Sequence, residues 1–370
     1  MTQHIYFSMG WYFKEIHYGV ARYAHEKNWR LSADTPMVSL PPDPNKYDGS
    51  ICQYREGGHY DEILSSDKPK VELTLLKPEL NLARVDLDNK AIGAMAAEYF
   101  MAKAYRSYCV VHYISGYHSD LRAEGFRETL NDHDFDCAEI FISAKGHDRE
   151  QSLPHLLESL EKLPKPLALF ATFDVNGDTC LKVCEEAGIR VPEEIAVLGA
   201  ENNELICDWT PVPMSSINVD FHSLGYQSAK LLDQMMAGEP IPEQPILISP
   251  TKVVERQSSS GLAVQNPEVR QALYFMNESL DLIKGVDDIA REVACSRRKL
   301  ENAFREHLNI SINESLIRMR ITACKKWLRE SELTIKEIAS KIGIKSEANL
   351  FRLFKARTGM TTKEYRRQVF

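Results

Sequence analysis

The C-terminal part of the chain contains one short pattern twice, and this duplication constrains the fold more than any other feature of the sequence. The matching positions are Ile289, Ala290, Ser296, Leu300 and Phe304 in the first copy and Ile338, Ala339, Ser346, Leu350 and Phe354 in the second. In each copy an apolar pair can bury one helix, a small residue allows a sharp turn, and a serine can cap a second helix. The pattern predicts helix-turn-helix motifs at about 286–307 and 335–357, separated by a helix-like stretch from Glu314 to Arg329.

The second helix of each motif has leucine and phenylalanine four positions apart, so both face inward and leave polar residues outward. The outward residues are Arg297, Arg298, Lys299, Glu301, Asn302 and Arg305 in the first copy and Glu347, Asn349, Arg352 and Lys355 in the second. Arginine can bond guanine edges and asparagine adenine edges, while lysine and arginine also hold phosphates. We predict these residues as DNA contacts. The alternative is that both are ordinary solvent-exposed helix faces. It explains a single copy as well as DNA binding does, but it explains two copies poorly.

Charge divides the chain in the same place. Residues 266–370 contain 21 Lys and Arg against 14 Asp and Glu, a net charge of +7, whereas the preceding residues carry −15. A basic module supplies the attraction to phosphates that DNA binding needs, and an acidic region does not lie along DNA. The charge distribution agrees with the duplicated motif.

The segment from Asp288 to Gln368 resembles the DNA-binding domain of the AraC family of bacterial transcription regulators. The resemblance rests on Ser-Glu-Ala-Asn-Leu-Phe-Arg-Leu-Phe-Lys at 346–355 and Gly-Met-Thr-Thr-Lys-Glu-Tyr-Arg-Arg at 359–367. It implies an all-α domain whose two recognition helices enter successive major grooves, roughly 34 Å apart. The departures from the family pattern are Ala294 where Gly is commoner, Asn309 for Gly, and Thr362 for Pro. Alanine fits the first turn if its φ is negative.

The length of 370 residues predicts two or three domains, and 44% apolar composition predicts globular ones. The N-terminus has no secretion signal and the chain has no run of eighteen apolar residues, so we expect a cytoplasmic protein. The cysteines, at 52, 109, 137, 180, 184, 207, 295 and 324, show no zinc-ligand spacing and no CxxC pair, which fits a reducing compartment. Cys180 and Cys184 share a helical face and are interpreted as buried small side chains. The sequence implies no metal and no cofactor.

Strand and helix signals alternate upstream of the basic module. The predicted strands are 5–8, 49–53, 71–76, 108–113, 138–142, 167–171 and 195–199, and the predicted helices are 13–27, 90–103, 120–131, 152–162, 176–187 and 224–236. Such alternation predicts βαβ units with parallel sheets, which collect ligands beyond the carboxyl ends of their strands. Two such sheets in sequence suggest two lobes with a cleft between them.

Four segments of this region resemble the sugar-binding domain of lactose-repressor and purine-repressor relatives, whose fold periplasmic sugar-binding proteins share. They are 85–97, beginning Val-Asp-Leu-Asp-Asn-Lys; 119–126, Ser-Asp-Leu-Arg-Ala-Glu-Gly-Phe; 171–174, Ala-Thr-Phe-Asp; and 191–199, Val-Pro-Glu-Glu-Ile-Ala-Val-Leu-Gly. The resemblance implies a two-lobed, type I periplasmic-binding-protein-like α/β domain at 1–256 with parallel sheets. A linker at 257–267 would join it to the all-α AraC-type domain at 268–370. Together they resemble xylose-responsive transcription activators, which implies D-xylose as effector, with another pentose or hexose as the alternative.

Position by position, the resemblance gives Arg122, Asp174 and Glu201 as polar contacts to sugar, with Asn202 beside them. Glu201 stands where Asp is usual, and its extra methylene moves the carboxylate by about 1.5 Å. The aromatic residues Trp11, Tyr12, Phe13 and Phe173 could cover the C–H faces of a sugar ring, and core packing explains them equally well. In the alternative reading, Asp174 only caps a helix and Arg122 only caps or pairs on the surface.

These observations predict a transcription regulator, not an enzyme, that binds a double-stranded operator as a homodimer, contacts RNA polymerase and lies away from membranes. Sugar binding would favour lobe closure and so change the geometry of the DNA-binding domains. A transport-type sugar-binding protein would need an export signal and no basic tail. A DNA-repair alkyl transferase would need a reactive Cys beside His and a four-Cys zinc site, and neither spacing is present. The sequence does not decide whether the protein activates or represses transcription, or which operator sequence it binds.

Overall fold

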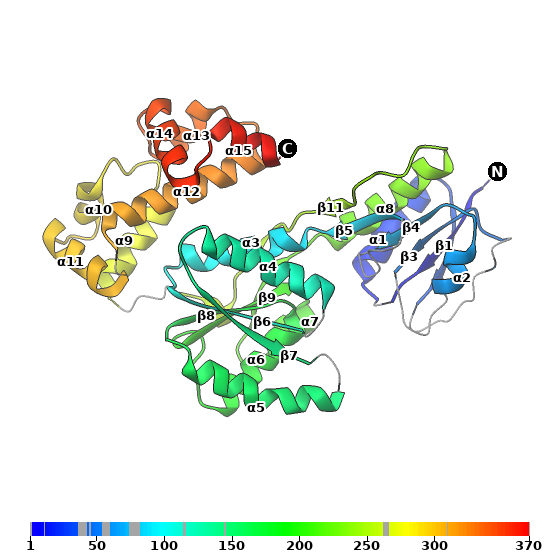
Figure 1. Ribbon diagram of the computed structural model, residues 1–370, viewed down its shortest axis with the longest axis horizontal. Helices are drawn as coiled ribbons and strands as arrows, with labels where there is room; N and C mark the ends of the chain where they lie inside the picture. The colour runs from blue at the N-terminus through cyan, green and yellow to red at the C-terminus, as the bar shows by residue number, and fades with distance from the viewer. Residues whose placement is uncertain are drawn as a thin grey trace. The chain divides into compact units, whose positions relative to one another are not determined.

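A computed structural model describes residues 2–10, 12–35, 43, 46–53, 60–73, 82–113, 116–143, 146–261, 266–308 and 310–369 (Figure 1). Trp11, Asn309 and linker residues 262–265 therefore lie outside the described residues. Two compact units are distinguished. The first comprises 1–97, 108–164 and 169–259, and the second comprises 98–107, 165–168 and 260–370.

The first sheet contains strands in the order β11-β5-β4-β3-β1-β2, and all its pairs are parallel. The strands are β1 (His4–Ser8), β2 (Arg30–Asp34), β3 (Gly49–Cys52), β4 (Lys70–Leu73), β5 (Ala83–Leu87) and β11 (Ile246–Ile248). The accompanying helices are α1 (Lys14–Glu26), α2 (Tyr60–Ser65) and α8 (Phe221–Met236). Ile5, Phe7 and Val20 belong to one buried cluster with Leu224 and Leu232. The apolar runs expected of strands covered by helices therefore form the core.

The second sheet has the order β12-β10-β9-β8-β6-β7. Its strands are β6 (Ser107–Tyr113), β7 (Cys137–Ile142), β8 (Leu167–Ala171), β9 (Ile195–Glu201), β10 (Ser215–Asn218) and β12 (Lys252–Val254). Its helices are α3 (Asn89–Ala102), α4 (Tyr117–Asn131), α5 (Gly146–Lys162), α6 (Asp174–Glu186) and α7 (Glu204–Cys207). The predicted parallel sheets are confirmed, and one edge strand departs from them, because β12 pairs antiparallel with β10. The reason is connectivity: β10 leads out of this sheet, and β12 returns beside it.

The chain passes between the two sheets at three places among the described strands, after β5, after β10 and after β11. Backbone hydrogen bonds join these crossovers. Asp88 N donates to Ile248 O over 2.9 Å, and Thr251 N donates to Asn218 O over 2.9 Å. The crossover after β11 is therefore hydrogen-bonded to each of the other two.

The end of the α/β domain lies later than expected. Gln257–Ser259 forms a short 3-10 helix, and Ser258 and Ser259 are fully buried. Ser258 Oγ donates to Val197 O over 2.6 Å and accepts from Ser215 N over 2.9 Å. Residues 257–259, where the linker was predicted to begin, thus pack with the second sheet in the structure. These small polar residues satisfy backbone groups of the second sheet instead of joining domains.

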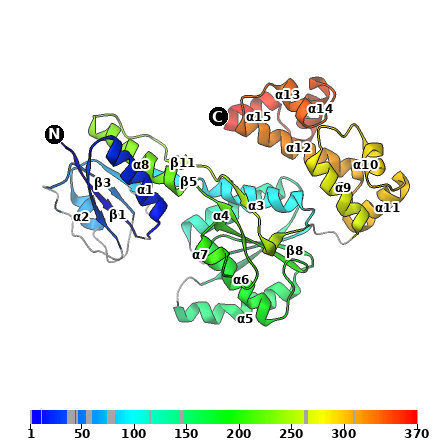
Figure 2. The same cartoon turned by 180° about the vertical axis from the view of Figure 1, so that it is seen from behind.

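The C-terminal domain is all-α. Its helices are α9 (Pro267–Glu278), α10 (Val286–Glu292), α11 (Arg297–Leu308), α12 (Ile312–Glu330), α13 (Ile335–Lys341), α14 (Glu347–Thr358) and α15 (Thr362–Val369). Figures 1 and 2 show α9–α11 gathered around one part of α12 and α13–α15 around the other. Leu300 and Phe304 are buried in the first group, and Leu350 and Phe354 in the second. Both predicted helix-turn-helix motifs are confirmed.

The turns of the two motifs share one backbone conformation although their residues differ. Ala294 has φ +53° in the first turn, and Gly343 has φ +69° in the second. The condition that alanine keeps a negative φ is not met, so Ala294 takes the left-handed conformation that glycine adopts more readily. The first turn therefore keeps its geometry at a cost in backbone strain.

Replacing Ala294 with Gly is expected to raise the free energy of unfolding by about 1 kcal/mol, because glycine adopts the left-handed conformation without a Cβ clash. The reverse change, Gly343→Ala, should lower it by more, since the new Cβ would lie 2.4 Å from Leu280 O. Urea unfolding of the full chain, followed by circular dichroism, measures both. Equal effects of one sign would contradict the assignment of strain to Ala294.

Candidate functional site

The most constrained side chain of the second sheet's lobe is Arg122 on α4, which is only 2% exposed. Its Nε donates to Asn89 Oδ1 over 2.8 Å, its Nη1 to Thr172 O over 2.8 Å, and its Nη2 to Glu201 Oε1 over 3.0 Å. These partners use three of the five N–H donors of a guanidinium. One hydrogen on each terminal nitrogen is left for a ligand. The surface-pair alternative for Arg122 is wrong.

Glycine brings α4 close to α3 and so positions this arginine. A Cβ at Gly93 would lie 2.0 Å from Arg122 O, and a Cβ at Gly125 would lie 2.1 Å from Lys90 O. The two helices can therefore approach only where neither has a side chain. Phe173 then covers the guanidinium, whose Cζ lies 4.3 Å from the ring centroid. The predicted aromatic residue thus stacks on the arginine in this structure, a cation–π contact that holds the fork in place.

Glu201 ends β9 and Asn202 follows it, and both have unusual backbone conformations, with φ +101° and +51°. Side chains from other elements hold this loop. Asn202 N donates to Ser216 Oγ over 3.0 Å, and Asn203 N donates to Asp174 Oδ2 over 2.7 Å. The positive φ values turn the Glu201 carboxylate toward Arg122. Such strained residues collect at sites where the backbone must present a side chain.

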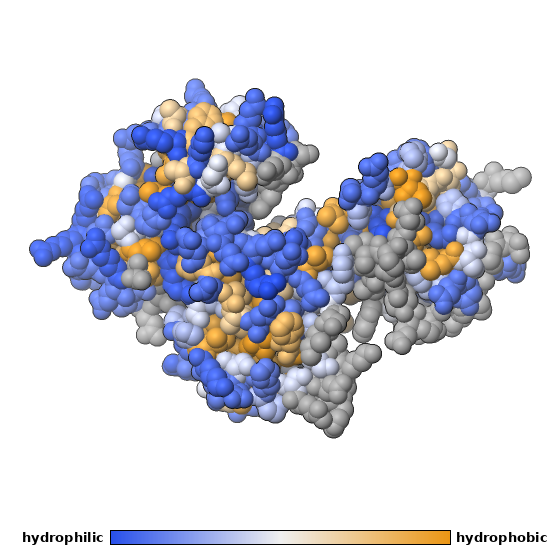
Figure 3. Space-filling view, viewed as in Figure 1, coloured by the Kyte–Doolittle hydropathy of each residue, from blue (hydrophilic) through white to orange (hydrophobic). Residues whose placement is uncertain are grey.

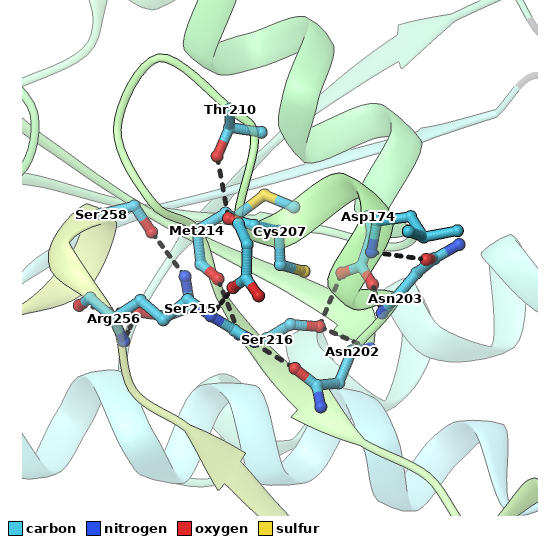
Figure 4. A network of polar contacts seen from close by, with 12 residues as sticks. Asp174, Asn202, Asn203, Cys207, Thr210, Met214, Ser215, Ser216, Arg256 and Ser258 are labelled. Carbon is cyan, nitrogen blue, oxygen red and sulfur yellow. Dashed lines mark hydrogen bonds and ion pairs between the residues drawn. The ribbon is translucent and has the colours of Figure 1, made fainter.

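Asp174 supports this loop from beneath. It is 2% exposed, and its Oδ1 accepts from Ser216 Oγ over 2.6 Å, as the network in Figure 4 shows. The interpretation of Asp174 as a helix cap is wrong, because the residue in the N-cap position of α6 is Phe173. One carboxylate oxygen accepts from the loop at Asn203 N and the other accepts from Ser216, which itself accepts from Asn202 N, so Asp174 positions Glu201 and Asn202. Burial outweighs these hydrogen bonds and raises the pKa of Asp174 to about 7.

The raised pKa of Asp174 gives a testable pH dependence. Between the ordinary value of 3.8 and about 7, the folded protein binds this proton more tightly than the unfolded chain. Stability contributed by the group is therefore fully present below the unfolded pKa and is lost as pH rises toward 7. Asp174→Asn stays neutral, so wild type should lose roughly 1–3 kcal/mol more than the variant between pH 4 and pH 8. Parallel pH profiles in urea unfolding would contradict this assignment.

A chain of amides leads from the site to the crossovers. Asn202 Nδ2 donates to Asn218 Oδ1 over 3.2 Å, and Asn218 Nδ2 donates to Thr251 Oγ1 over 2.8 Å. Arg256 Nη1 donates to Asn202 Oδ1 over 2.9 Å. Arg122 reaches the first crossover through Asn89. Glu201, Asn202 and Arg122 are thus linked through hydrogen bonds to the segments at the crossovers.

The aromatic residues after β1 divide differently. Phe13 stacks on Phe221 with ring centroids 4.4 Å apart and packs against the core of the first lobe. Packing, the alternative reading, accounts for Phe13. Tyr12 is 41% exposed, and its hydroxyl lies 3.3 Å from His17 Nδ1. The prediction for Trp11 falls on a residue outside the described part of the chain.

Sequence reasoning missed Thr172, Ser216, Asn89 and Arg256 as members of the site. Asn89 and Thr172 lie within segments that resemble sugar-binding domains, whereas Ser216 and Arg256 lie outside them, and none of the four has a local sequence signal of a functional role. Asn89 opens α3, and Ser216 lies in β10. Their contribution depends on contacts between distant segments, such as the 42 positions that separate Ser216 from Asp174. Only the folded chain shows it.

The recognition helices present the predicted basic faces. Arg298, Asn302 and Arg305 are exposed on α11, and Asn349, Arg352 and Lys355 are exposed on α14. Arg297 is also exposed and pairs with Asp287 over 3.1 Å. Residues three and four apart share a helix face, so each helix offers arginine and an amide side chain together. This is the chemistry that reads guanine and adenine edges.

Three predicted DNA contacts are less available. Glu301 Oε2 accepts from Ile312 N over 3.1 Å and so supports the start of α12. Lys299 Nζ lies 2.6 Å from Glu268 Oε1, which directs it toward α9. Glu347 is half-buried in the first turn of α14. Glu301 and Lys299 thus contact other elements of the domain, and the role of all three residues toward DNA stays a prediction.

Comparison with known proteins separates the same two regions. A periplasmic binding protein-like domain matches residues 97–259, and a helix-turn-helix domain matches residues 289–368. Each of the two regions thus matches one domain family, and the second match spans the two helix-turn-helix motifs of the C-terminal domain from residue 289 onward. Within the described part of the chain, the longest apolar helices fall short of what crossing a bilayer requires.

Two curated relatives are xylose operon regulatory proteins. The protein of Haemophilus influenzae is 31% identical over 211 residues, covering 57% of this chain and 54% of the relative. The protein of Escherichia coli strain K12 is 33% identical over 212 residues, with the same coverage. The chain spans about half the length of the curated relatives it matches.

A solved structure described as the xylose-binding transcription activator xylR matches with a TM-score of 0.63. It is 23% identical and covers 100% of this chain and 98% of its own. The match supports the predicted fold, a two-lobed α/β domain followed by a helical domain with two helix-turn-helix motifs.

Proposed function

We propose that this protein is a sugar-responsive transcription regulator and not an enzyme. The observation that carries the proposal is the presence of two features in one chain. The guanidinium of Arg122 pairs with the carboxylate of Glu201 in a lobe whose fold is typical of sugar-binding proteins. The C-terminal domain exposes two recognition helices. Arg122 and Glu201 together offer donors and acceptors to adjacent hydroxyls, which is how proteins recognise sugars. The basic faces of α11 and α14 would meet double-stranded operator DNA.

The effector proposed is D-xylose. The names of two curated relatives and of a matching structure refer to xylose. Glu201 extends further than Asp would, so another pentose or hexose is the competing assignment. The proposed contacts are Arg122, Glu201 and Asn202, with Phe173 or Tyr12 against a C–H face of the ring.

Regulation would follow from coupling the site to the crossovers. A sugar bound by Arg122, Glu201 and Asn202 would contact residues that are hydrogen-bonded to the crossovers, because Arg122 bonds Asn89 and Asn202 bonds Asn218. A ligand shifts an equilibrium only through its differential affinity for the two states. Sugar would therefore favour one arrangement of the lobes, and that arrangement would set the geometry of the DNA-binding domains. We further propose a homodimer that activates transcription through RNA polymerase and acts in the cytoplasm.

Thermal unfolding of the full chain against a panel of free pentoses and hexoses tests the sugar assignment. A ligand present at a hundred times its Kd stabilises by about 2.7 kcal/mol, which is a clear shift. A higher unfolding temperature with D-xylose alone supports D-xylose as the effector. A higher unfolding temperature with another sugar would make that sugar the effector and leave the proposed site unchanged. Unchanged unfolding with every sugar would contradict the proposal.

A further inference from the structure

The recognition helix of the second motif exposes an aromatic side chain to solvent. Phe351 on α14 is 41% exposed, whereas its neighbours Leu350 and Phe354 are fully buried in the core of that motif. The motif is therefore anchored without Phe351. Exposing a large apolar side chain to water is unfavourable, and folding gains little from it.

The first recognition helix shows that this position need not be apolar. Counted from the capping serine, Phe351 corresponds to Glu301 on α11. Glu301 bonds Ile312 N and supports the scaffold, while Phe351 has no comparable place in the core. The difference between the copies is a change of chemistry on one helix face, not a requirement of the fold.

The surroundings of Phe351 are those of a DNA-reading face. Ala348 and Lys355 lie three and four positions from Phe351 and so share its face of α14, Arg352 is the next residue along the helix, and all three are exposed. Arg352 Nη2 lies 3.3 Å from Asn349 Oδ1. Figure 3 shows that the visible face of the C-terminal domain is largely hydrophilic with hydrophobic residues scattered in it. An apolar ring flanked by cations suits a partner that is anionic overall but has local apolar groups.

Duplex DNA presents such groups as thymine 5-methyls in the major groove, where phenylalanine is among the side chains that contact them. We propose that Phe351 is a specificity-determining residue that contacts thymine methyl groups in the groove entered by α14. Arg352 and Lys355 hold the adjacent base edge and phosphate. The inference rests on the proposed DNA-binding function and adds a base preference to it.

The test uses the full chain and duplexes selected with it from a random-sequence library. Each thymine of a selected duplex is replaced in turn by uracil, which keeps base pairing and removes only the methyl group. Fluorescence anisotropy at one salt concentration measures each affinity. For wild type, uracil at one or two positions should weaken binding by about fourfold, the effect of one apolar methyl contact.

Phe351→Ala should weaken binding to the thymine duplex and lose the thymine preference at those positions. Tyr274→Ala is the matched control, because Tyr274 is an exposed aromatic on α9 and should leave the thymine preference unchanged. Uracil without effect at every position, or Phe351→Ala with an undiminished preference, overturns this inference alone. Failure to select any sequence overturns the DNA-binding function and the inference with it.

Discussion

Arg122→Ala is expected to lower the affinity for the effector sugar by about a hundredfold or more. A hydrogen bond from a charged donor contributes roughly 1.5–3 kcal/mol, and the proposal gives the ligand the two N–H groups of Arg122 that its three protein partners leave over. The change also leaves the Glu201 carboxylate without its partner, so its hydroxyl contacts lose their geometry. Isothermal titration calorimetry with the sugar identified by thermal unfolding measures the loss.

Arg122→Lys should rescue little of this affinity, because an ammonium cannot hold Asn89, Thr172 and Glu201 in one planar fork. Arg127→Ala provides the control on the same helix: Arg127 pairs with Glu139 at the surface and is 40% exposed. That variant should bind sugar like wild type. Wild-type affinity in Arg122→Ala would show that the ligand binds elsewhere.

Arg320→Met should disconnect the two helix-turn-helix motifs. Arg320 on α12 donates from Nε to Ile342 O over 2.8 Å and from Nη2 to Gly343 O over 2.9 Å. Nη2 also donates to Ile283 O, which precedes α10. One guanidinium thus joins the turn of the second motif to the segment that begins the first.

Methionine keeps the length of the side chain but leaves three carbonyl groups without a donor. We expect a loss of roughly 3 kcal/mol in the free energy of unfolding, and DNA affinity should fall at least tenfold because both recognition helices must fit successive grooves together. Arg318→Met is the control on the same helix, since Arg318 pairs with Glu314 near the surface and such pairs contribute 1 kcal/mol or less, roughly. Equal losses in the two variants would contradict the assignment.

Local signals in the sequence predicted the C-terminal domain well. Ser346 caps α14 through Asn349 N, and Asn266 caps α9 through Val269 N. The signal for the start of each helix therefore lies within three residues of sequence. The spacing of Leu300 and Phe304 fixed the buried face of α11. The sign of φ at Ala294 was not predictable, because it depends on how tightly the next helix packs.

The sheets were predictable where strands are apolar and helices follow them. β2 reads Arg-Leu-Ser-Ala-Asp, which alternates polar and apolar residues, and β12 has only three residues, so neither contains the continuous apolar run that marked the predicted strands. Their pairing is decided by neighbours far away in the chain. The same limit applies to Asp174: its position was predicted, but its bond with Ser216 requires the folded lobe.

The central claim is that sugar binding and DNA binding are coupled in one chain. The most direct test measures the affinity of the full chain for a selected duplex with and without saturating effector sugar. The account predicts at least a fivefold change, corresponding to roughly 1 kcal/mol of coupling, which Arg122→Ala abolishes. An identical DNA affinity with and without bound sugar would contradict it.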